Sequence, residues 1–95
     1  MEKLLKIVRE GERDNIEFKE VLTSYHLKGG RFQQLACQMN HRILMGKGKA
    51  IYVIGVSDSG KLKGLPKQRF LETVEIIRKI AREIDAKIKS IEEYI

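Results

Sequence analysis

The chain has 95 residues, of which 42% are hydrophobic and 34% are charged, enough for one small domain with its own core and too few for two. No apolar run approaches the roughly 20 residues of a membrane span, and acids interrupt the N-terminal lysines, so we expect neither a membrane span nor a signal peptide. The single cysteine, Cys37, excludes an internal disulfide and predicts a reducing compartment. We therefore expect residues 1–95 to form a single cytoplasmic domain, and the high charge with little proline fits a thermophilic protein.

The first half of the chain predicts two short apolar elements and a helix. Residues 3–8 form a short apolar piece, a strand or a helical turn, and residues 16–22 alternate apolar and charged side chains as a half-buried strand does. In residues 31–46 apolar side chains recur at helical spacing, and Gly46 ends the pattern. The apolar face of this helix consists of Phe32, Leu35, Ala36, Met39 and Ile43.

The second half predicts a hairpin, a helix and a last strand. Residues 50–56 form a continuous apolar run, typical of a central strand, and residues 61–65 predict a short returning strand. Pro66 opens a helix over residues 66–84, and residues 86–95 predict the last strand. The order strand, strand, helix, strand, strand, helix, strand predicts an α+β fold, a mixed sheet of four to five strands with two helices packed on one face.

A glycine-rich stretch lies between the two strands of the predicted hairpin. The stretch "IYVIGVSDSGKLKGL", residues 51–65, contains Gly55-x-x-x-x-Gly60-Lys61, the spacing of a phosphate-binding P-loop. A P-loop needs a serine or threonine after the lysine to hold Mg²⁺, and a helix must follow directly. Here Leu62 follows the lysine, and the next residues alternate as a strand does. The stretch therefore predicts a turn with Gly60 at positive φ, and we expect no nucleotide or other cofactor in this chain.

Positive charge is concentrated in the middle of the chain. Residues 1–25 and residues 70–95 each contain five basic and six acidic side chains, whereas residues 26–69 contain nine basic side chains and one acid. Segregated charge of this kind attracts polyanions, and with 6% aromatic residues we expect contacts to a nucleic-acid backbone more than base stacking. The candidate nucleic-acid-binding residues, which we expect to emerge on one surface, are Lys28, Arg31, Gln38, Arg42, Lys47, Lys49, Lys61, Lys63, Lys67 and Arg69.

Four stretches of the chain resemble a known domain. IEFK (16–19), RFQQLACQMNHRI (31–43), GKGKAIYVIGVSDSGKLKGL (46–65) and FLETVEIIRKIAREIDAKI (70–88) are similar to the N-terminal domain of elongation-factor-like GTPases, the archaeal and eukaryotic GTP-binding protein one and its relatives. The resemblance implies an accessory domain of a translation-related GTPase that binds RNA or the ribosome. It also implies a GTPase domain, in the same or another chain, as a partner. No GTPase motif lies in this chain, so we expect no enzymatic activity from it alone.

A more distant resemblance is to the AlbA-like domain of Schlafen-type proteins. It is carried by Glu12, by Glu17-Phe18-Lys19 and by Gly55-Val56-Ser57-Asp58. Some members of that family use three carboxylates in metal-dependent RNA cleavage. The resemblance therefore implies that Glu12, Glu17 and Asp58 would be catalytic and would bind Mg²⁺ or Mn²⁺. In this sequence Ser57 replaces one aspartate of the family pattern, and MGKGKA replaces its Asn-x-x-Gly-Gly stretch.

Three functions stay open at the level of the sequence. The first is an RNA- or ribonucleoprotein-binding accessory domain that acts through the basic middle segment. The second is a metal-dependent endoribonuclease of the Schlafen type. The third is a protein-interaction domain, which an exposed apolar patch formed by Ile91, Tyr94 and Ile95 would favour.

Overall fold

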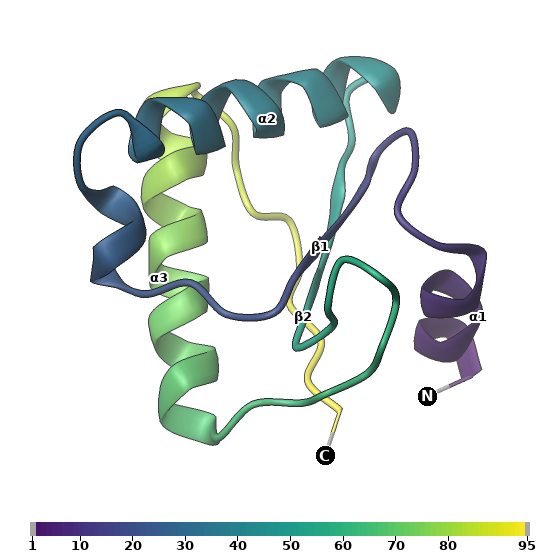
Figure 1. Ribbon diagram of the computed structural model, residues 1–95. Coiled ribbons are helices and arrows are strands. Elements are labelled where there is room, and N and C mark those ends of the chain that lie inside the picture. The colour runs from purple at the N-terminus through teal and green to yellow at the C-terminus, as the bar shows by residue number, and fades with distance from the viewer. Residues whose placement is uncertain (1, 95) are drawn as a thin grey trace.

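Three α-helices, one short 3₁₀ helix and two strands make up the part of the chain that the structure describes, residues 2–94 (Figure 1). In this computed structural model the elements are α1 (Glu2–Glu10), β1 (Ile16–Lys19), η1 (Ser24–Leu27), α2 (Arg31–Met45), β2 (Ile51–Ile54) and α3 (Lys67–Glu83). The helices predicted at residues 31–46 and 66–84 are confirmed as α2 and α3, and residues 3–8 belong to a helix, α1. No helix within residues 2–94 is long and apolar enough to cross a membrane.

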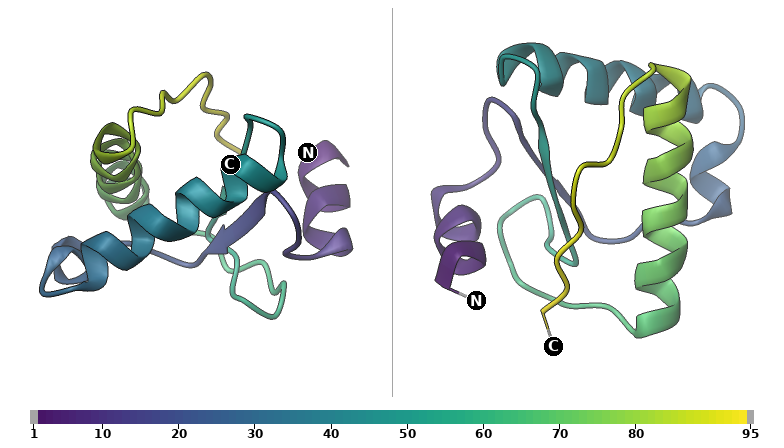
Figure 2. Two further views of the ribbon diagram at one scale, coloured as in Figure 1. Left: turned by 90° about the horizontal axis from the view of Figure 1, so that it is seen from above. Right: turned by 180° about the vertical axis from the view of Figure 1, so that it is seen from behind.

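Within residues 2–94 the sheet consists of two strands, β1 and β2, which run parallel. Ile16 lies opposite Ile51, and Lys19 lies opposite Ile54. The α1 helix lies on one side of this pair, whereas α2 and α3 lie on the other (Figures 1 and 2). The predicted mixed sheet of four to five strands with two helices on one face is therefore wrong.

The predicted returning strand is reduced to one antiparallel bridge, between Val56 and Leu62. A Cβ added at Gly55, whose φ is +86°, would lie 3.2 Å from the Cα of Gly64, so the two backbones almost touch. The N–H groups of Lys63 and Gly64 both donate to the carbonyl of Gly55, at 2.8 and 2.9 Å. Because two consecutive N–H groups bond to one carbonyl, the regular pairing of an antiparallel ladder does not continue beyond this bridge.

The predicted last strand is also absent, since residues 86–94 form no ladder in the described chain. This segment runs down the back of the molecule, behind the sheet (Figure 2). Ala86 and Ile88 pack against the core between α2 and α3, whereas Ile91 and Tyr94 are exposed. Ala86 and Ile88 are thus half-buried by packing, and this burial does not require a hydrogen-bonded ladder.

The alternation of β1 separates two hydrophobic cores, because successive side chains of a strand point to opposite faces. Ile16 and Phe18 face α1 and form the smaller core with Val53 and Val56. The side chains of α1 that cover it are Leu4, Ile7 and Val8. Glu17 lies on the opposite face of the sheet, toward α2.

The larger core fills the space between α2 and α3. Its buried members are Leu22, Ala36, Met39, Ile76, Ile77, Ile80 and Ala81. The buried hydroxyl of Thr73 accepts a hydrogen bond from the N–H of Leu22 at 3.0 Å and donates to its carbonyl at 3.1 Å. This pair of bonds ties the segment after β1 to α3 and so fixes the path of the chain into η1 and α2.

Glycine ends α2 and proline precedes α3, as the sequence predicts. The N–H of Gly46 donates to the carbonyls of Arg42 and Ile43 at 3.0 and 3.2 Å, and a side chain at this position would collide with Asn15. Pro66 stands directly before the first residue of α3, where a missing N–H costs nothing. The C-terminal end of α2 and the N-terminal end of α3 are therefore both well defined.

Candidate nucleic-acid interface

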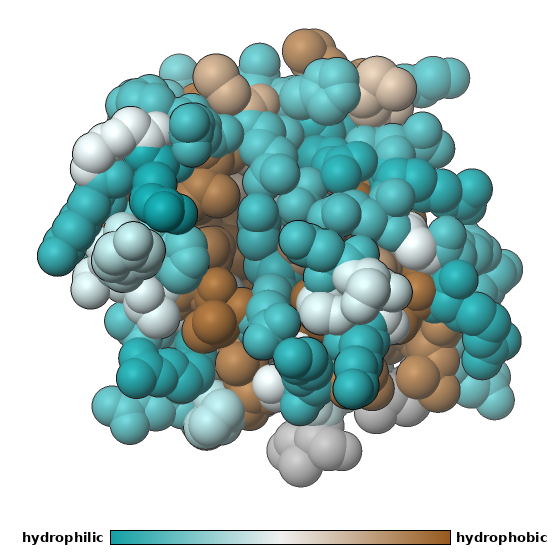
Figure 3. Space-filling model, in the orientation of Figure 1, coloured by the Kyte–Doolittle hydropathy of each residue, from teal (hydrophilic) through white to brown (hydrophobic). Residues whose placement is uncertain are grey.

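The outer face of α2 carries no acid. Residues 21–57 contain neither aspartate nor glutamate, and α2 lies wholly within this stretch. The exposed side chains of α2 are Arg31, Gln33, Gln34, Cys37, Asn40, His41, Leu44 and Met45. Hydrophilic residues cover most of the face seen in Figure 3, with hydrophobic patches near its upper edge and in its lower half. This helix therefore presents amide and imidazole groups that can bond to phosphate or sugar oxygens without repelling them.

Exposed cations stand at both ends of α2. Lys28 and Arg31 lie at its N-terminal end, and Lys47 and Lys49 lie in the loop after its C-terminal end. We call these four side chains the α2-flanking cations. None of them is in an ion pair with an acid of residues 2–94, and the 15 residues of α2 separate the two pairs by about 22 Å at ~1.5 Å per residue.

Four other predicted contact residues are neutralised by acids. Arg42 pairs with Glu17 on the inner side of α2. The remaining three pairs are Lys63 with Glu20 (3.6 Å), Lys67 with Glu93 (2.6 Å) and Arg69 with Glu72 (2.9 Å). The acids come from segments on either side of the basic region. The positive charge that residues 26–69 present without an ion-pair partner is therefore smaller than their composition suggests, and it is carried by the α2-flanking cations and Lys61.

Glu17 is buried and holds Arg42 in place. The residue is 2% exposed, its Oε1 accepts from Arg42 Nε at 2.9 Å, and Lys19 Nζ lies 3.4 Å from its Oε2. Arg42 Nη1 also donates to the carbonyl of Asp14 at 2.9 Å. Burial and the Glu17 carboxylate together raise the pKa of Tyr52, its neighbour across the sheet, above the ordinary value. The Nε and Nη1 groups of Arg42 are thus bonded within the fold, which leaves fewer N–H donors for a phosphate.

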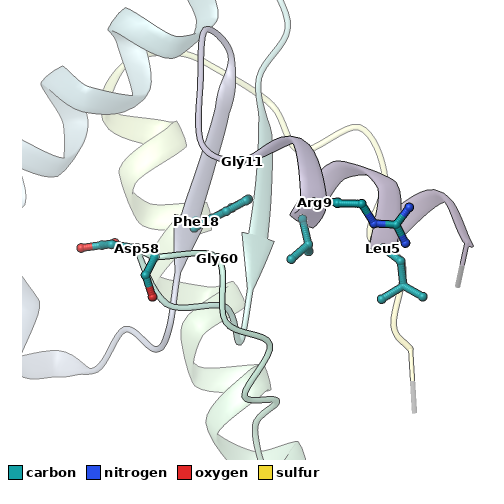
Figure 4. Close-up of a pocket in the computed structure, with 8 residues that line it drawn as sticks. Leu5, Arg9, Gly11, Phe18, Asp58 and Gly60 are labelled. Carbon is teal, nitrogen blue, oxygen red and sulfur yellow. The ribbon is translucent and has the colours of Figure 1, made fainter.

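Glu12 and Glu17 lie together, but Asp58 does not join them. Glu12 accepts a hydrogen bond from the N–H of Phe18 at 2.9 Å, and burial raises the pKa of Glu12, with a further rise from the neighbouring Glu17 carboxylate. Asp58 lines a hollow of about 410 Å³ between α1 and the loop after β2, on the Phe18 side of the sheet (Figure 4). In that hollow the side chains of Arg9 and Asp58 point away from each other (Figure 4).

The predicted metal site of three carboxylates is therefore not assembled in the described structure. Among residues 2–94 no three aspartate, glutamate, histidine or cysteine side chains lie close enough together to hold a metal ion. The physical reason is the alternation of β1, which sends Phe18 and Glu17 to opposite faces. Asp58 lies on the Phe18 side of the sheet, whereas the side chain of Glu17 lies on the α2 side.

A small polar cavity lies where β1, η1 and α2 meet. It has a volume of about 180 Å³ and is lined by Lys19, His26, Arg31, Gln34, Leu35 and Gln38. The sequence singled out Arg31 and Gln38 as nucleic-acid contacts but not Lys19 or His26. The sequence between β1 and α2 predicts only a loop, and the 3₁₀ turn of η1 that brings His26 to the cavity has no periodic signal.

Known proteins similar to this chain include two mammalian GTP-binding proteins and a viral protein. No protein-family profile and no solved structure matches the chain. GTP-binding protein 2 of mouse and of human is 34% identical over 84 residues, which cover 88% of this chain and 14% of those proteins. An uncharacterized protein of Acanthamoeba polyphaga mimivirus is 36% identical over 77 residues, which cover 80% of this chain and 40% of that protein.

The chain is related to a segment of GTP-binding protein 2. This relationship confirms the coarser part of the resemblance noted in the sequence, a domain related to GTP-binding proteins. It gives no support to the AlbA-like, Schlafen-type resemblance. The chain spans about a seventh of the length of GTP-binding protein 2, so the activity of the whole relative does not transfer to it.

Proposed function

We propose that this chain is an accessory domain of a translation-related, GTPase-like protein and that it binds structured RNA through the outer face of α2 and the loops at its two ends. The observation that carries the proposal is the set of α2-flanking cations, exposed and unpaired in the described chain, on either side of an acid-free helix face. The relationship to GTP-binding protein 2 supports the GTPase context. The choice of RNA over DNA rests on the resemblance to translation-related GTPases.

The spacing of the cations fits a polyanion better than a single small anion. The two pairs stand about 22 Å apart, which is about six nucleotides of a stacked strand at the ~3.4 Å per nucleotide of duplex DNA. Lysine and arginine meet phosphates without reading sequence, so this surface would position an RNA by its backbone and shape. Among residues 2–94 the exposed aromatics are Tyr25 and Tyr94, too few for a stacking platform.

Salt dependence of RNA binding tests the proposal. Fluorescence anisotropy with a labelled RNA hairpin should show an affinity that falls steeply between about 50 and 200 mM salt, because each phosphate contact releases counterions. The double variant Lys47→Ala/Lys49→Ala should reduce the log–log salt slope by about 0.7–0.9 for each phosphate that the variant no longer neutralises. The matched control is Lys87→Ala/Lys89→Ala, which removes the same charge from the segment behind the sheet and should leave the slope unchanged.

Two results would overturn the proposal. One is an affinity of the wild-type protein that does not change with salt. The other is an equal loss of affinity in both double variants, which would show that net charge alone, and not the surface of α2, attracts the RNA.

The exposed C-terminal segment favours a second candidate function, docking of another protein domain. Ile91 is 46% exposed and Tyr94 is 37% exposed, and neither packs against either core; Ile95 lies outside the described residues. An exposed apolar pair of this kind fits a protein partner better than an RNA. If the wild-type protein binds a GTPase domain and the variant Ile91→Asp does not, with RNA affinity unchanged, this second function is established. Equal binding of the GTPase domain by wild type and Ile91→Asp would exclude it.

A further inference from the structure

The polar cavity at the junction of β1, η1 and α2 is too small for a whole cofactor. Its volume of about 180 Å³ lies below the roughly 300–1,000 Å³ of pockets that hold drug-sized ligands. It would admit one phosphate with part of the nucleoside attached to it. Five of its six lining side chains are polar or charged, and Leu35 is the apolar exception.

Two cations give the cavity a preference for anions. Lys19 is 17% exposed and lies 3.4 Å from Glu17 Oε2, but Arg42 pairs with the same carboxylate, so two cations share one negative charge and positive charge remains. The guanidinium of Arg31 lies 5.0 Å from the centroid of the Tyr25 ring. The guanidinium makes no ion pair with an acid of residues 2–94, so its N–H groups are available to bond in a fork to a phosphate.

Neutral groups beside these cations add directional hydrogen bonds. His26 Nδ1 accepts from the N–H of Thr23 at 3.0 Å, so the ring proton is on Nε2 and remains available as a donor. Gln34 is exposed at the cavity and offers both an amide donor and a carbonyl acceptor. Gln38 Oε1 is buried and has no hydrogen-bond partner among residues 2–94, which is unusual for a folded protein. A half-turn of its amide would exchange this oxygen with the amide nitrogen, so the side chain can place either an acceptor or a donor at this position.

We propose that this cavity binds one phosphate-bearing ribonucleotide, either free or within an RNA strand. Lys19 and Arg31 would hold the phosphate, and the carboxamides of Gln34 and Gln38 would pair with the 2′-hydroxyl or the base edge, since each presents a donor and an acceptor. Tyr25, 57% exposed and in contact with Arg31, provides a face on which the base can stack. For a nucleotide within RNA, the inference rests on the proposed RNA-binding function.

Nuclear magnetic resonance titration with small probes separates the cavity from the wider surface. Uridine 5′-monophosphate and adenosine 5′-monophosphate should shift the backbone amides of residues 24–38 and the side-chain amides of Gln34 and Gln38. Inorganic phosphate and uridine, tested alone, should each bind more weakly than the monophosphates. An RNA octamer that shifts the same signals at lower concentration identifies RNA as the source of the nucleotide, whereas shifts with the mononucleotides alone identify a free nucleotide.

Two substitutions should remove the site without unfolding the protein. Arg31→Ala truncates an exposed side chain, and Gln38→Leu replaces a side chain whose buried oxygen has no partner among residues 2–94. Arg31→Ala should weaken binding of the monophosphate roughly 10- to 100-fold, the effect of losing a hydrogen bond that involves a charged group, and Gln38→Leu should weaken it roughly 2- to 10-fold, the effect of losing a neutral hydrogen bond. Matched controls are Gln33→Ala, on the same helix but outside the cavity, and Lys47→Ala/Lys49→Ala, which should weaken RNA binding and leave the monophosphate affinity unchanged.

The outcomes distinguish the two proposals. Salt-dependent RNA binding without any monophosphate shift at residues 24–38 would overturn the cavity assignment and leave the proposed function intact. Monophosphate binding that survives both Arg31→Ala and Gln38→Leu would also overturn it. Equal affinity for inorganic phosphate and for the monophosphates would show an anion site that does not recognise a nucleoside, and would refute the ribonucleotide assignment. Monophosphate binding at the cavity without RNA binding would refute the proposed function alone.

Discussion

Replacing Arg42 by alanine tests whether this side chain stabilises the fold or contacts RNA. Arg42 Nε donates to Glu17 Oε1, and Nη1 donates to the carbonyl of Asp14, both at 2.9 Å. Because Glu17 is 2% exposed, the substitution leaves a buried carboxylate whose remaining cationic partner in the described chain is Lys19, at 3.4 Å. We therefore expect Arg42→Ala to lower the free energy of unfolding substantially and to leave the RNA affinity of the folded protein unchanged.

The expected loss of stability is large for a domain of this size. Removing one partner of a buried ion pair costs about 3–5 kcal/mol. A domain of 95 residues has a total stability on the order of 5–14 kcal/mol, at roughly 0.05–0.15 kcal/mol per residue. A loss of about 3 kcal/mol lowers the Tm by about 12–24 °C, since 1 kcal/mol corresponds to roughly 4–8 °C for domains of this length.

Urea and thermal unfolding, followed by far-ultraviolet circular dichroism, measure this loss. The matched control is Arg78→Ala, because Arg78 Nε lies 3.5 Å from Glu75 on the exposed face of α3 and such a pair contributes at most about 1 kcal/mol. The double variant Glu17→Leu/Arg42→Leu removes both charges and should recover most of the loss. Equal destabilisation by Arg42→Ala and Arg78→Ala would refute the reasoning.

Three further predictions concern local features of the fold. Burial and the adjacent Glu17 carboxylate raise the pKa of Glu12, so stability present at acidic pH is lost as the pH rises; Glu12→Gln removes this loss, and urea unfolding should show its advantage over wild type growing from acidic to neutral pH. Gly55→Ala puts a Cβ at φ +86° and should lower the free energy of unfolding by at least about 1–2 kcal/mol, measured by urea unfolding. Thr73→Val leaves the buried N–H and carbonyl of Leu22 unpaired and should lower the free energy of unfolding by about 2–4 kcal/mol, whereas Thr73→Ser keeps the hydroxyl and should cost less, both measured by urea unfolding.

The helices were predictable because they are long and periodic, whereas the sheet was not. Apolar spacing over α2 and α3 fixes both the element type and the buried face from local sequence. The pairing of strands depends on segments far apart in the chain. The local alternation of residues 61–65 and 86–95 cannot show that Gly55 lies against Gly64 and that the pairing of residues 61–65 stops at one bridge. Nor can it show that Ala86 and Ile88 are half-buried by packing without a ladder. The type of the first element could not be predicted because the apolar run of residues 3–8 is too short to distinguish the periodicity of a helix from that of a strand.

The same limit explains the outcome for the candidate site. The sequence shows where cations occur along the chain but not which acids approach them, and Lys67 meets Glu93, which is 26 residues away. The α2-flanking cations lie inside the acid-free stretch, so no local acid can neutralise them. The cavity residues Lys19 and His26 come from two elements that only the fold brings together.

The Glu17-Phe18-Lys19 stretch has a role in this fold that does not require a metal. Phe18 is fully buried in the core against α1, and Glu17 points to the other face, where it anchors α2 through Arg42. Lys19 then lies on the same face as Glu17, is held near its carboxylate, and reaches the cavity beside α2. Three consecutive side chains thus join the two cores and place one cation. The carboxylate of Glu17 therefore acts as a structural counter-ion, and a substitution there should affect Arg42 and Lys19 together.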